Sequence, residues 1–363
     1  MHYRELSTPA LVIDLDVVER NLDRMATYCR NSNIRLRPHT KTHKMLELAR
    51  MQMERGAVGL TVAKIGEAEV MATTGVKQIL VAHPIIGQEK LHRLAKIARD
   101  VDVLIAVDDD AAAAAISRVA VAFGCNFGIL VELDTGFRRC GLPPGRACVQ
   151  LARTIENLPG TEMRGLMTFF GSVWGSEEER KREVDKIVLR LEQTVGAFQE
   201  AGMPLEIVSG GSTPAASFSH VIPGLTEIRP GTYVFNDRNT YYQGVCSLED
   251  CAARVVTTVI STAVRGQAII DAGSKTLSQD VLGSGPMTGY GHIVEEPEVP
   301  LFKLNEEHGY LRTSPSHSFK IGDVLTVIPN HVCTCVNMHD EVFLIRNEQV
   351  IGSWKVAARG KIR

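Results

Sequence analysis

Two apolar runs decide the expected fold of this chain of 363 residues: residues 101–107, VDVLIAV, and residues 127–133, FGILVEL. Each is nearly continuous in branched apolar residues and has the length of a β-strand. Six more runs of this kind lie in the first two thirds of the sequence, near residues 35–40, 57–63, 78–83, 163–169, 205–209 and 225–229. Near-continuous apolar strands indicate a parallel sheet that is buried on both faces.

Segments with helical periodicity separate these runs, for example residues 45–53 and the charged stretch from Glu177 to Gln199. Eight strands that alternate with helices are the number that closes a (β/α)8 barrel. An open doubly wound sheet is the alternative, but its glycine fingerprint, GxGxxG at the first strand-to-helix turn, is absent. We therefore expect an α/β fold with a TIM-like (β/α)8 barrel.

The pattern of apolar and helix-forming residues changes after about residue 240. Long helical stretches end, and short apolar runs separated by Gly, Asn, Asp and Pro follow at residues 253–264, 268–271, 324–328, 341–346 and 353–357. This pattern predicts a C-terminal, mostly antiparallel β-domain. We place the barrel at residues 8–238 and the β-domain at 239–363. The run Leu11–Leu15 precedes the first helix and could join either domain.

The composition is that of an ordinary globular protein that can bury a large core. The chain is 44% hydrophobic and 23% charged, with a net charge of −2, which argues against an extended nucleic-acid surface. We find no apolar stretch that would serve as a signal peptide or membrane helix. The eight cysteines show no disulfide spacing, so we expect reduced thiols and a cytoplasmic location.

The first candidate site is the basic run at residues 37–44, RPHTKTHK, which ends the first barrel strand. Barrel enzymes build their active sites where strands end. A lysine in a partly desolvated pocket loses solvation of its ammonium group, so its pKa falls and it can form a Schiff base. Lys41 is our candidate, with His39 and His43 beside it. A solvated basic loop would explain the run equally well.

Glycine-rich segments follow the last two barrel strands. Residues 209–213, SGGST, follow the seventh strand, and Pro230-Gly231-Thr232 follows the eighth. In barrels, the loops after these two strands often bind phosphate through backbone N–H groups. Double glycines also occur in ordinary turns, so the argument for phosphate is that both segments follow the last two barrel strands. After the fifth strand, Arg138 and Arg139 are adjacent in the sequence. They could bind an anion, or they could be ordinary charges of an exposed loop.

A candidate metal pair lies in the β-domain, within residues 329–335, PNHVCTC. If the segment is extended, His331, Cys333 and possibly Cys335 share one face. Imidazole and thiolate suit Zn²⁺ and other transition ions. Two ligands are too few for a closed structural site and would fit an open catalytic one. Simple burial is the alternative explanation of a lone His-x-Cys.

Together these motifs make the whole chain similar to a known family. The sequence resembles the metal-activated D-threonine aldolase and D-serine dehydratase family, whose barrel is of the alanine racemase type. The resemblance is carried by residues 8–14, 37–44, 134–141, 209–213, 271–275, 305–309 and 329–340. It implies pyridoxal phosphate and a divalent metal (Mn, Mg or Zn) as cofactors, and it suggests a homodimer.

The resemblance implies roles for individual residues. Lys41 is similar to the lysine that binds the cofactor covalently, with His39 as a second catalytic residue. Arg139 corresponds to the arginine near the phenolic oxygen, and Arg229 to the one that faces the pyridine nitrogen. His331 and Cys333 correspond to the metal pair. The other cofactor-binding residues implied are Ser209, Gly210, Gly211, Ser212, Gly231, Thr232 and Tyr233.

One position departs from the family pattern. Some aldolases of this group have a Tyr-His pair after the sixth strand, where this chain has Phe169 and Phe170. A polar contact to cofactor or substrate is therefore missing or replaced. Trp174 is a candidate to shape the pocket instead. The resemblance implies cleavage of D-β-hydroxy-α-amino acids of the D-threonine type to glycine and an aldehyde. Dehydration of D-serine or 3-hydroxy-D-aspartate is the main alternative. Racemisation and non-catalytic binding of pyridoxal phosphate are further ones.

Overall fold

The structure is a computed structural model that describes residues 1–281, 288–314 and 319–363. It divides into two compact units, and the chain passes between them several times. We call them the barrel unit (Arg24–Lys41, Leu46–Gly231 and Gly360–Arg363) and the β unit (Met1–Asp23, Thr42–Met45 and Thr232–Arg359). The division of the chain into domains at residues 238 and 239 stays a prediction.

A single sheet of eight parallel strands forms the centre of the barrel unit, in the order β2-β9-β8-β7-β6-β5-β4-β3. A parallel bridge between His39 and Thr61 joins the two ends of this order. The predicted (β/α)8 barrel is therefore confirmed, and each strand overlaps a predicted run. The strands are β2 (Arg35–Leu36), β3 (Leu60–Val62), β4 (Gln78–Val81), β5 (Asp102–Val107), β6 (Phe127–Leu133), β7 (Thr161–Thr168), β8 (Ile207–Gly210) and β9 (Glu227–Ile228).

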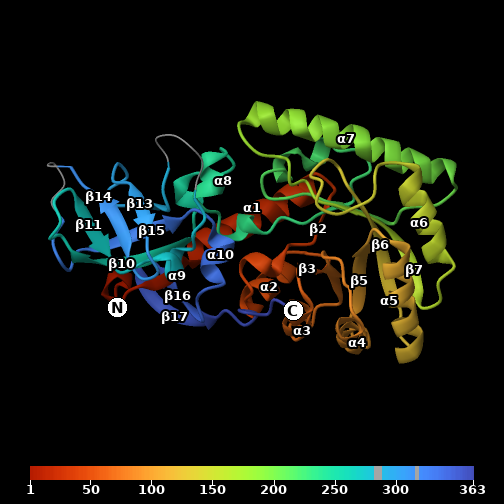
Figure 1. Cartoon of the computed structure of the whole chain (residues 1–363), viewed down its shortest axis with the longest axis horizontal. Helices are drawn as coiled ribbons and strands as arrows, with labels where there is room; N and C mark the ends of the chain where they lie inside the picture. Colours follow the sequence, from red (N-terminus) through yellow and green to blue (C-terminus); the bar gives the residue numbers. More distant parts are fainter. Residues whose placement is uncertain (282–287, 315–318) are drawn as a thin grey trace. The chain divides into compact units, whose positions relative to one another are not determined.

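Helices alternate with these strands and lie around the outside of the sheet (Figure 1). The longest helix, α7, has Ser176 as its N-cap. The Ser176 side chain accepts a hydrogen bond from the Glu179 backbone N–H, and the Glu179 side chain accepts one from the Ser176 backbone N–H. This reciprocal pair is a capping box, which fixes the start of a helix. The helices are α2 (Leu46–Glu54), α3 (Ile65–Ala72), α4 (Gln88–Ile97), α5 (Asp110–Phe123), α6 (Arg146–Glu156) and α7 (Glu177–Glu200). Short 3-10 turns accompany them at η2 (Thr40–Thr42) and η3 (Ala216–Val221).

The inside of the barrel has an apolar layer. One core cluster joins side chains from β4 to β8 without any helix residue: Leu80, Leu104, Ala106, Leu130, Met167 and Ile207. All of these side chains are at most 1% exposed. Inward-facing residues further along β6, β8 and β9 are polar, so the barrel changes from an apolar layer to a polar one towards the carboxyl ends of its strands.

A mostly antiparallel sheet of nine strands forms the β unit, as predicted. Its main path is β13-β14-β11-β10-β1-β16-β17, and β15 joins β10 to β12. The run at residues 11–15 belongs here, because β1 pairs antiparallel with β10 and parallel with β16. The strands are β1 (Ala10–Asp14), β10 (Ala253–Ser261), β11 (Gln267–Ile270), β12 (Gly291–Ile293), β13 (Leu301–Leu304), β14 (Gly309–Arg312), β15 (Val324–Pro329), β16 (Glu341–Arg346) and β17 (Gln349–Lys355).

Short helices complete the β unit, and α1 (Leu15–Asn31) leads out of it into the barrel unit. The others are η1 (Tyr3–Glu5), η4 (Thr232–Val234), α8 (Arg238–Tyr242), η5 (Leu248–Asp250), α9 (Ser274–Leu277) and α10 (Val332–Val336). In the part of the chain that the structure describes, no helix is long and apolar enough to cross a membrane. All eight cysteines carry free thiols, as expected.

Candidate active site

Hydrogen bonds on both sides hold the chain that leads to Lys41. The His39 N–H donates to the Pro230 carbonyl at 3.0 Å, and the Thr61 N–H donates to the Pro38 carbonyl at 2.9 Å. Lys41 follows in η2, and its backbone N–H donates to Nδ1 of His39 at 3.4 Å. Lys41 is exposed, so the desolvation expected for its amine is wrong for this structure. The reason is that η2 carries it past the end of β2, onto the rim of the barrel.

The two glycine loops lie next to each other, because β8 and β9 are paired neighbours. Gly211 has φ +95, a conformation that favours glycine, and a Cβ on Gly210 would lie 2.7 Å from Cζ of Phe170. The N–H groups of Gly211, Ser212 and Gly231 donate to no acceptor within residues 1–281, 288–314 and 319–363. Backbone N–H groups at adjacent strand ends that make no hydrogen bond within the described residues are suited to bind a phosphate group.

The close packing behind this loop gives a stability prediction. In Gly210→Ala the new methyl group meets the buried Phe170 ring, so we expect a loss of about 1–3 kcal/mol, typical of overpacking. Gly196→Ala is the control, since its Cβ in α7 would meet nothing within 4 Å and alanine gains about 1 kcal/mol of helix propensity. Urea unfolding should move the two midpoints in opposite directions. Equal shifts would contradict this packing.

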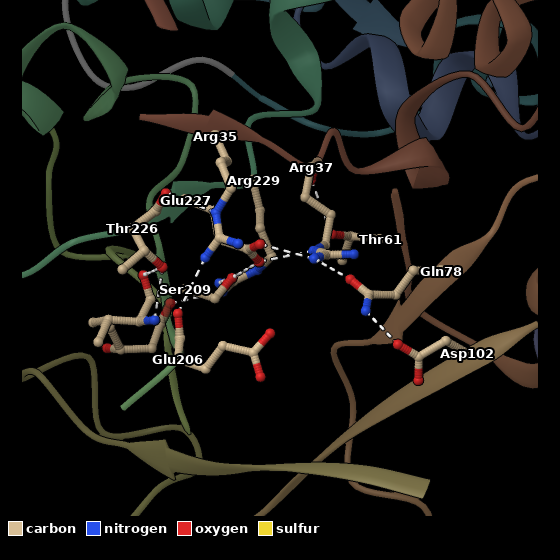
Figure 2. A network of polar contacts seen from close by, with 12 residues as sticks. Arg35, Arg37, Thr61, Gln78, Asp102, Glu206, Ser209, Thr226, Glu227 and Arg229 are labelled. Carbon is tan, nitrogen blue, oxygen red and sulfur yellow. Dashed lines mark hydrogen bonds and ion pairs between the residues drawn. The ribbon is translucent and has the colours of Figure 1, made fainter. Parts of the chain in front are cut away.

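A buried polar network occupies the inside of the barrel below these loops (Figure 2). Arg37 and Glu227, at 1% and 0% exposure, form a two-pronged ion pair with both N···O distances at 2.8 Å. Ser209 Oγ donates to Glu227 at 2.6 Å and accepts from Arg229 at 2.6 Å. Arg229 also donates to the Thr168 carbonyl at 2.7 Å. Ser209 therefore positions Arg229, and its hydroxyl is already committed inside the protein.

Arg229 stays a cation in this surrounding. Burial lowers its pKa to about 10, while the charges of Glu227 and Glu132 act in the opposite direction. At neutral pH the guanidinium group remains charged. A fixed buried cation of this kind would disfavour a second positive charge placed against it, such as a protonated pyridine nitrogen.

Glu132, on β6, was missed by the sequence analysis. It shares a face of the sheet with Ser209, because Glu132 pairs in register with Met167 and Met167 with Ser209. It is 3% exposed, and its Oε2 has no hydrogen-bond partner in the described part of the chain. Burial, and then the nearby Asp108, raise its pKa to about 7. The available signal was a carboxylate inside the apolar run at residues 127–133.

The raised pKa of Glu132 predicts a pH-dependent stability. The folded protein holds this proton up to about pH 7, above the ordinary carboxyl range near 4.5, so Glu132 makes stability fall as pH rises through that window. Glu132→Gln mimics the protonated form and should gain up to about 3 kcal/mol over wild type between pH 5 and pH 8. Unfolding in urea at both pH values measures this, with the exposed Glu200→Gln as control. Parallel pH curves for mutant and wild type would refute it.

Aromatic residues surround Arg139 after β6 and β7. Its guanidinium carbon lies 4.6 Å from the ring centre of Phe169 and 5.6 Å from that of Phe137. The two rings meet edge to face at 5.3 Å. Phe169 therefore offers Arg139 a cation–π contact where some aldolases were expected to have tyrosine. Phe170 is fully buried, which explains an apolar residue at that position.

A lysine–histidine pair after β3 and β4 was also missed. Lys64 Nζ lies 3.1 Å from Nε2 of His83, while Nδ1 of His83 lies 2.8 Å from the Pro84 carbonyl. A carbonyl oxygen only accepts, so Nδ1 carries the proton and Nε2 accepts from Lys64. Burial lowers the pKa of His83, and the charges of Lys64, Lys90 and Arg139 lower it further. These residues make this part of the rim positively charged.

The metal pair of the β unit lies where β15 ends. Residues 329–335 are not one extended segment, which was the condition for three side chains to share a face: His331 is the N-cap of α10, and Cys333 lies in its first turn. Cys335 is fully buried and contacts the Thr276 carbonyl at 3.2 Å, which separates it from the pair. The sequence analysis failed here because VCTC alternates like a strand, whereas Asp237 accepts a hydrogen bond from the Val332 N–H at 3.1 Å and fixes a helical start.

The surroundings of the pair suit a metal ion. Cys333 Sγ lies 3.2 Å from Oγ1 of Thr42 and 3.8 Å from that of Thr232. Burial lowers the pKa of His331, but a hydrogen bond to Cys333 and the charges of Asp237 and Asp280 raise it to about 9. No group of three His, Cys, Asp or Glu suited to a metal occurs among the described residues. Two donors of this chemistry fit an open, exchangeable site.

The fold and site define a barrel of the alanine racemase type joined to a β unit with a histidine–cysteine pair. Family models agree: residues 13–239 match the alanine racemase N-terminal domain, and residues 252–345 match a putative serine dehydratase domain. The chain is 31% identical to a D-threonine aldolase of Arthrobacter sp. over 362 residues, which cover 98% of this chain and 93% of that one.

Solved structures give the same result. A D-threonine aldolase from Filomicrobium marinum superposes with a TM-score of 0.92 at 32% identity, covering 99% of this chain and 98% of that one. A D-threo-3-hydroxyaspartate dehydratase from Delftia sp. HT23 gives a TM-score of 0.89 at 32% identity, with 98% of both chains covered. The chain belongs to the D-threonine aldolase and D-serine dehydratase family and is a lyase of that family, which implies pyridoxal phosphate as cofactor.

Proposed function

We propose that this protein is an aldolase that uses pyridoxal phosphate and a divalent metal to cleave D-β-hydroxy-α-amino acids into glycine and an aldehyde. The observation that carries the proposal is the contact between Thr42 and Cys333, 3.2 Å from Oγ1 to Sγ. Both residues belong to the β unit, and Thr42 directly follows Lys41, the proposed cofactor-binding lysine, in the chain. Both relatives named above as D-threonine aldolases support the substrate class.

The barrel unit would hold the cofactor. Lys41 would bind it covalently, the N–H groups of Gly211, Ser212 and Gly231 would bind its phosphate, and Thr232 and Tyr233 follow directly in the chain. Arg229 would face the ring nitrogen and Arg139 the phenolic oxygen. Bound pyridoxal phosphate would supply an electron sink for the charge left when the Cα–Cβ bond breaks.

The β unit would activate the substrate hydroxyl. His331 and Cys333 would hold the ion and leave positions open for the substrate. A bound divalent ion (Mn, Mg or Zn) would act as a Lewis acid on the β-hydroxyl group. The Cys333 thiol donates to Oγ1 of Thr42, and the Thr232 hydroxyl is placed to donate to Cys333 and would stabilise a thiolate there. His39 is proposed to move protons beside Lys41, since its Nδ1 accepts the Lys41 N–H and its Nε2 then carries the proton of the neutral ring.

Dehydration is the second candidate, and Cys333 favours it. A matching structure is a cysteine-to-alanine mutant of D-threo-3-hydroxyaspartate dehydratase in the metal-free form, and a second is a mutant of a histidine two positions earlier. The spacing equals that of His331 and Cys333. In a dehydratase, Lys41 would remove the Cα proton, whereas in an aldolase it would mainly hold the cofactor.

A product assay separates the two reactions. Purified enzyme with pyridoxal phosphate and Mn²⁺ is incubated with D-threonine, and products are quantified. We expect glycine and acetaldehyde in equal amounts. 2-Oxobutanoate with ammonia would instead establish the dehydratase, and L-allo-threonine, formed by inversion at Cα alone, would indicate a racemase. We also propose a homodimer and a cytoplasmic location, which sedimentation and cell fractionation would test.

A further inference from the structure

Asp280 lies beside one of the two ring nitrogens of His331. Its Oδ2 lies 3.2 Å from Nδ1 of His331, and both side chains are about two-fifths exposed. A surface pair of this kind contributes little to folding stability. An acceptor on one ring nitrogen does, however, fix which nitrogen carries the proton and which is left to bind a metal.

Other contacts hold Asp280 in this position from both its side chain and its backbone. Thr334 Oγ1 donates to Asp280 Oδ2 at 2.6 Å, and Ser278 Oγ lies 3.2 Å from the same oxygen. Asn330, the residue before His331, donates to the Asp280 carbonyl at 2.7 Å. Asn330 is 1% exposed and is itself held by Arg238 at 3.2 Å. The segments of Asp280 and His331 are therefore tied together at three points.

Ser278 adds an independent observation, because its backbone is strained. It has φ +74 and ψ 176, a region that is almost exclusive to glycine. The strained turn directs the Ser278 hydroxyl to Asp280, and the Asp280 N–H returns a hydrogen bond to that hydroxyl at 3.2 Å. Glycine would relieve the strain but would supply no hydroxyl. The serine at this position makes sense if the orientation of Asp280 matters more than local stability.

We propose that Asp280 is a positioning residue for the metal pair: it accepts the Nδ1 proton of His331, and so presents Nε2 as the metal-binding atom. This inference rests on the metal dependence proposed above. It does not make Asp280 a metal ligand. The nearby Asp237 faces the same histidine, but its two oxygens already accept backbone bonds from Thr240 and Val332, which assigns the ring contact to Asp280.

Metal binding, measured without turnover, tests this role. Enzyme loaded with pyridoxal phosphate is stripped of metal with EDTA and titrated with Mn²⁺, and free Mn²⁺ is measured by electron paramagnetic resonance. Loss of an outer-shell partner typically weakens metal binding about 10–100-fold. We expect that range for Asp280→Ala and a smaller loss for Asp280→Asn. Asp340→Ala, an exposed carboxylate of the same unit, is the control and should bind like wild type.

Two further readouts separate positioning from structure. In protein loaded with diamagnetic Zn²⁺, ¹⁵N spectra of His331 should show the proton on Nδ1 in wild type and a mixture of proton positions in Asp280→Ala. Ser278→Gly should keep or raise the unfolding midpoint while it weakens Mn²⁺ binding. Wild-type affinity in Asp280→Ala would overturn the proposal. So would a loss as complete as that of His331→Ala, which would make Asp280 a ligand. Wild type that binds no Mn²⁺ would instead count against the proposed function.

Discussion

Lys41→Ala is expected to abolish covalent attachment of pyridoxal phosphate and to lower kcat/KM on the order of 10²–10⁴-fold, the range of a lost proton-transfer residue. The loop that carries Lys41 is held by hydrogen bonds through His39 and Thr61, none of which involves the amine. The variant should therefore fold normally. The visible absorbance of the lysine-bound cofactor should disappear, and borohydride reduction should no longer fix the cofactor to the chain.

Lys186→Ala is the matched control for this experiment. Lys186 is an exposed lysine of α7 that pairs with Glu183. It should keep the absorbance, the activity and the unfolding midpoint of wild type. Added methylamine should restore part of the activity of Lys41→Ala if the amine carries protons. Wild-type rates in Lys41→Ala would contradict the assignment of this lysine.

Cys333→Ala is expected to have the second large effect on catalytic activity. Metal ions supply several kcal/mol of transition-state stabilisation, so loss of one of two protein donors should lower kcat/KM on the order of 10³-fold. His331→Ala should match it, and the double mutant should be little worse than either single mutant, because the two side chains act as one unit. Kinetics with saturating Mn²⁺ and D-threonine measure all three variants.

Cys335→Ala provides the control, two residues away on the same helix. Cys335 is fully buried and contacts the Thr276 carbonyl, so its loss should reduce stability but leave Mn²⁺ binding intact. If Cys335→Ala lost Mn²⁺ binding as fully as Cys333→Ala, the effect would come from the helix and not from a metal donor.

The sequence predicts the barrel well, because its strands are buried on both faces and appear as continuous apolar runs. Each of the eight expected runs overlaps a strand of the sheet, although β2 and β9 have only two residues each. It predicts the β unit less completely. The strands β12, β13 and β14 have three or four residues each, too few for a periodic signal. The turn at His331 depends on Asp237, which is remote in sequence.

The candidate site residues also fall into two groups: those in local motifs, which the sequence predicts, and those whose surroundings only the fold shows. Lys41, the glycine loops and the His331–Cys333 pair stand in local motifs, so the sequence points to them directly. Glu132, the Lys64–His83 pair and Asp280 stand in no motif, and only the fold shows what surrounds them. The exposure of Lys41 is equally invisible in the sequence, because the pattern of residues 37–44 does not say that η2 extends beyond the strand.

The most direct test of the central claim is aldol cleavage by verified metal-free enzyme. Protein loaded with pyridoxal phosphate is treated with EDTA, desalted and shown by elemental analysis to lack divalent metal. Glycine and acetaldehyde formed from D-threonine are then measured before and after addition of Mn²⁺. If Lys41 and the His331–Cys333 pair act together, the metal-free enzyme is inactive and Mn²⁺ restores both products in equal amounts. Full cleavage activity in the metal-free enzyme would contradict the account.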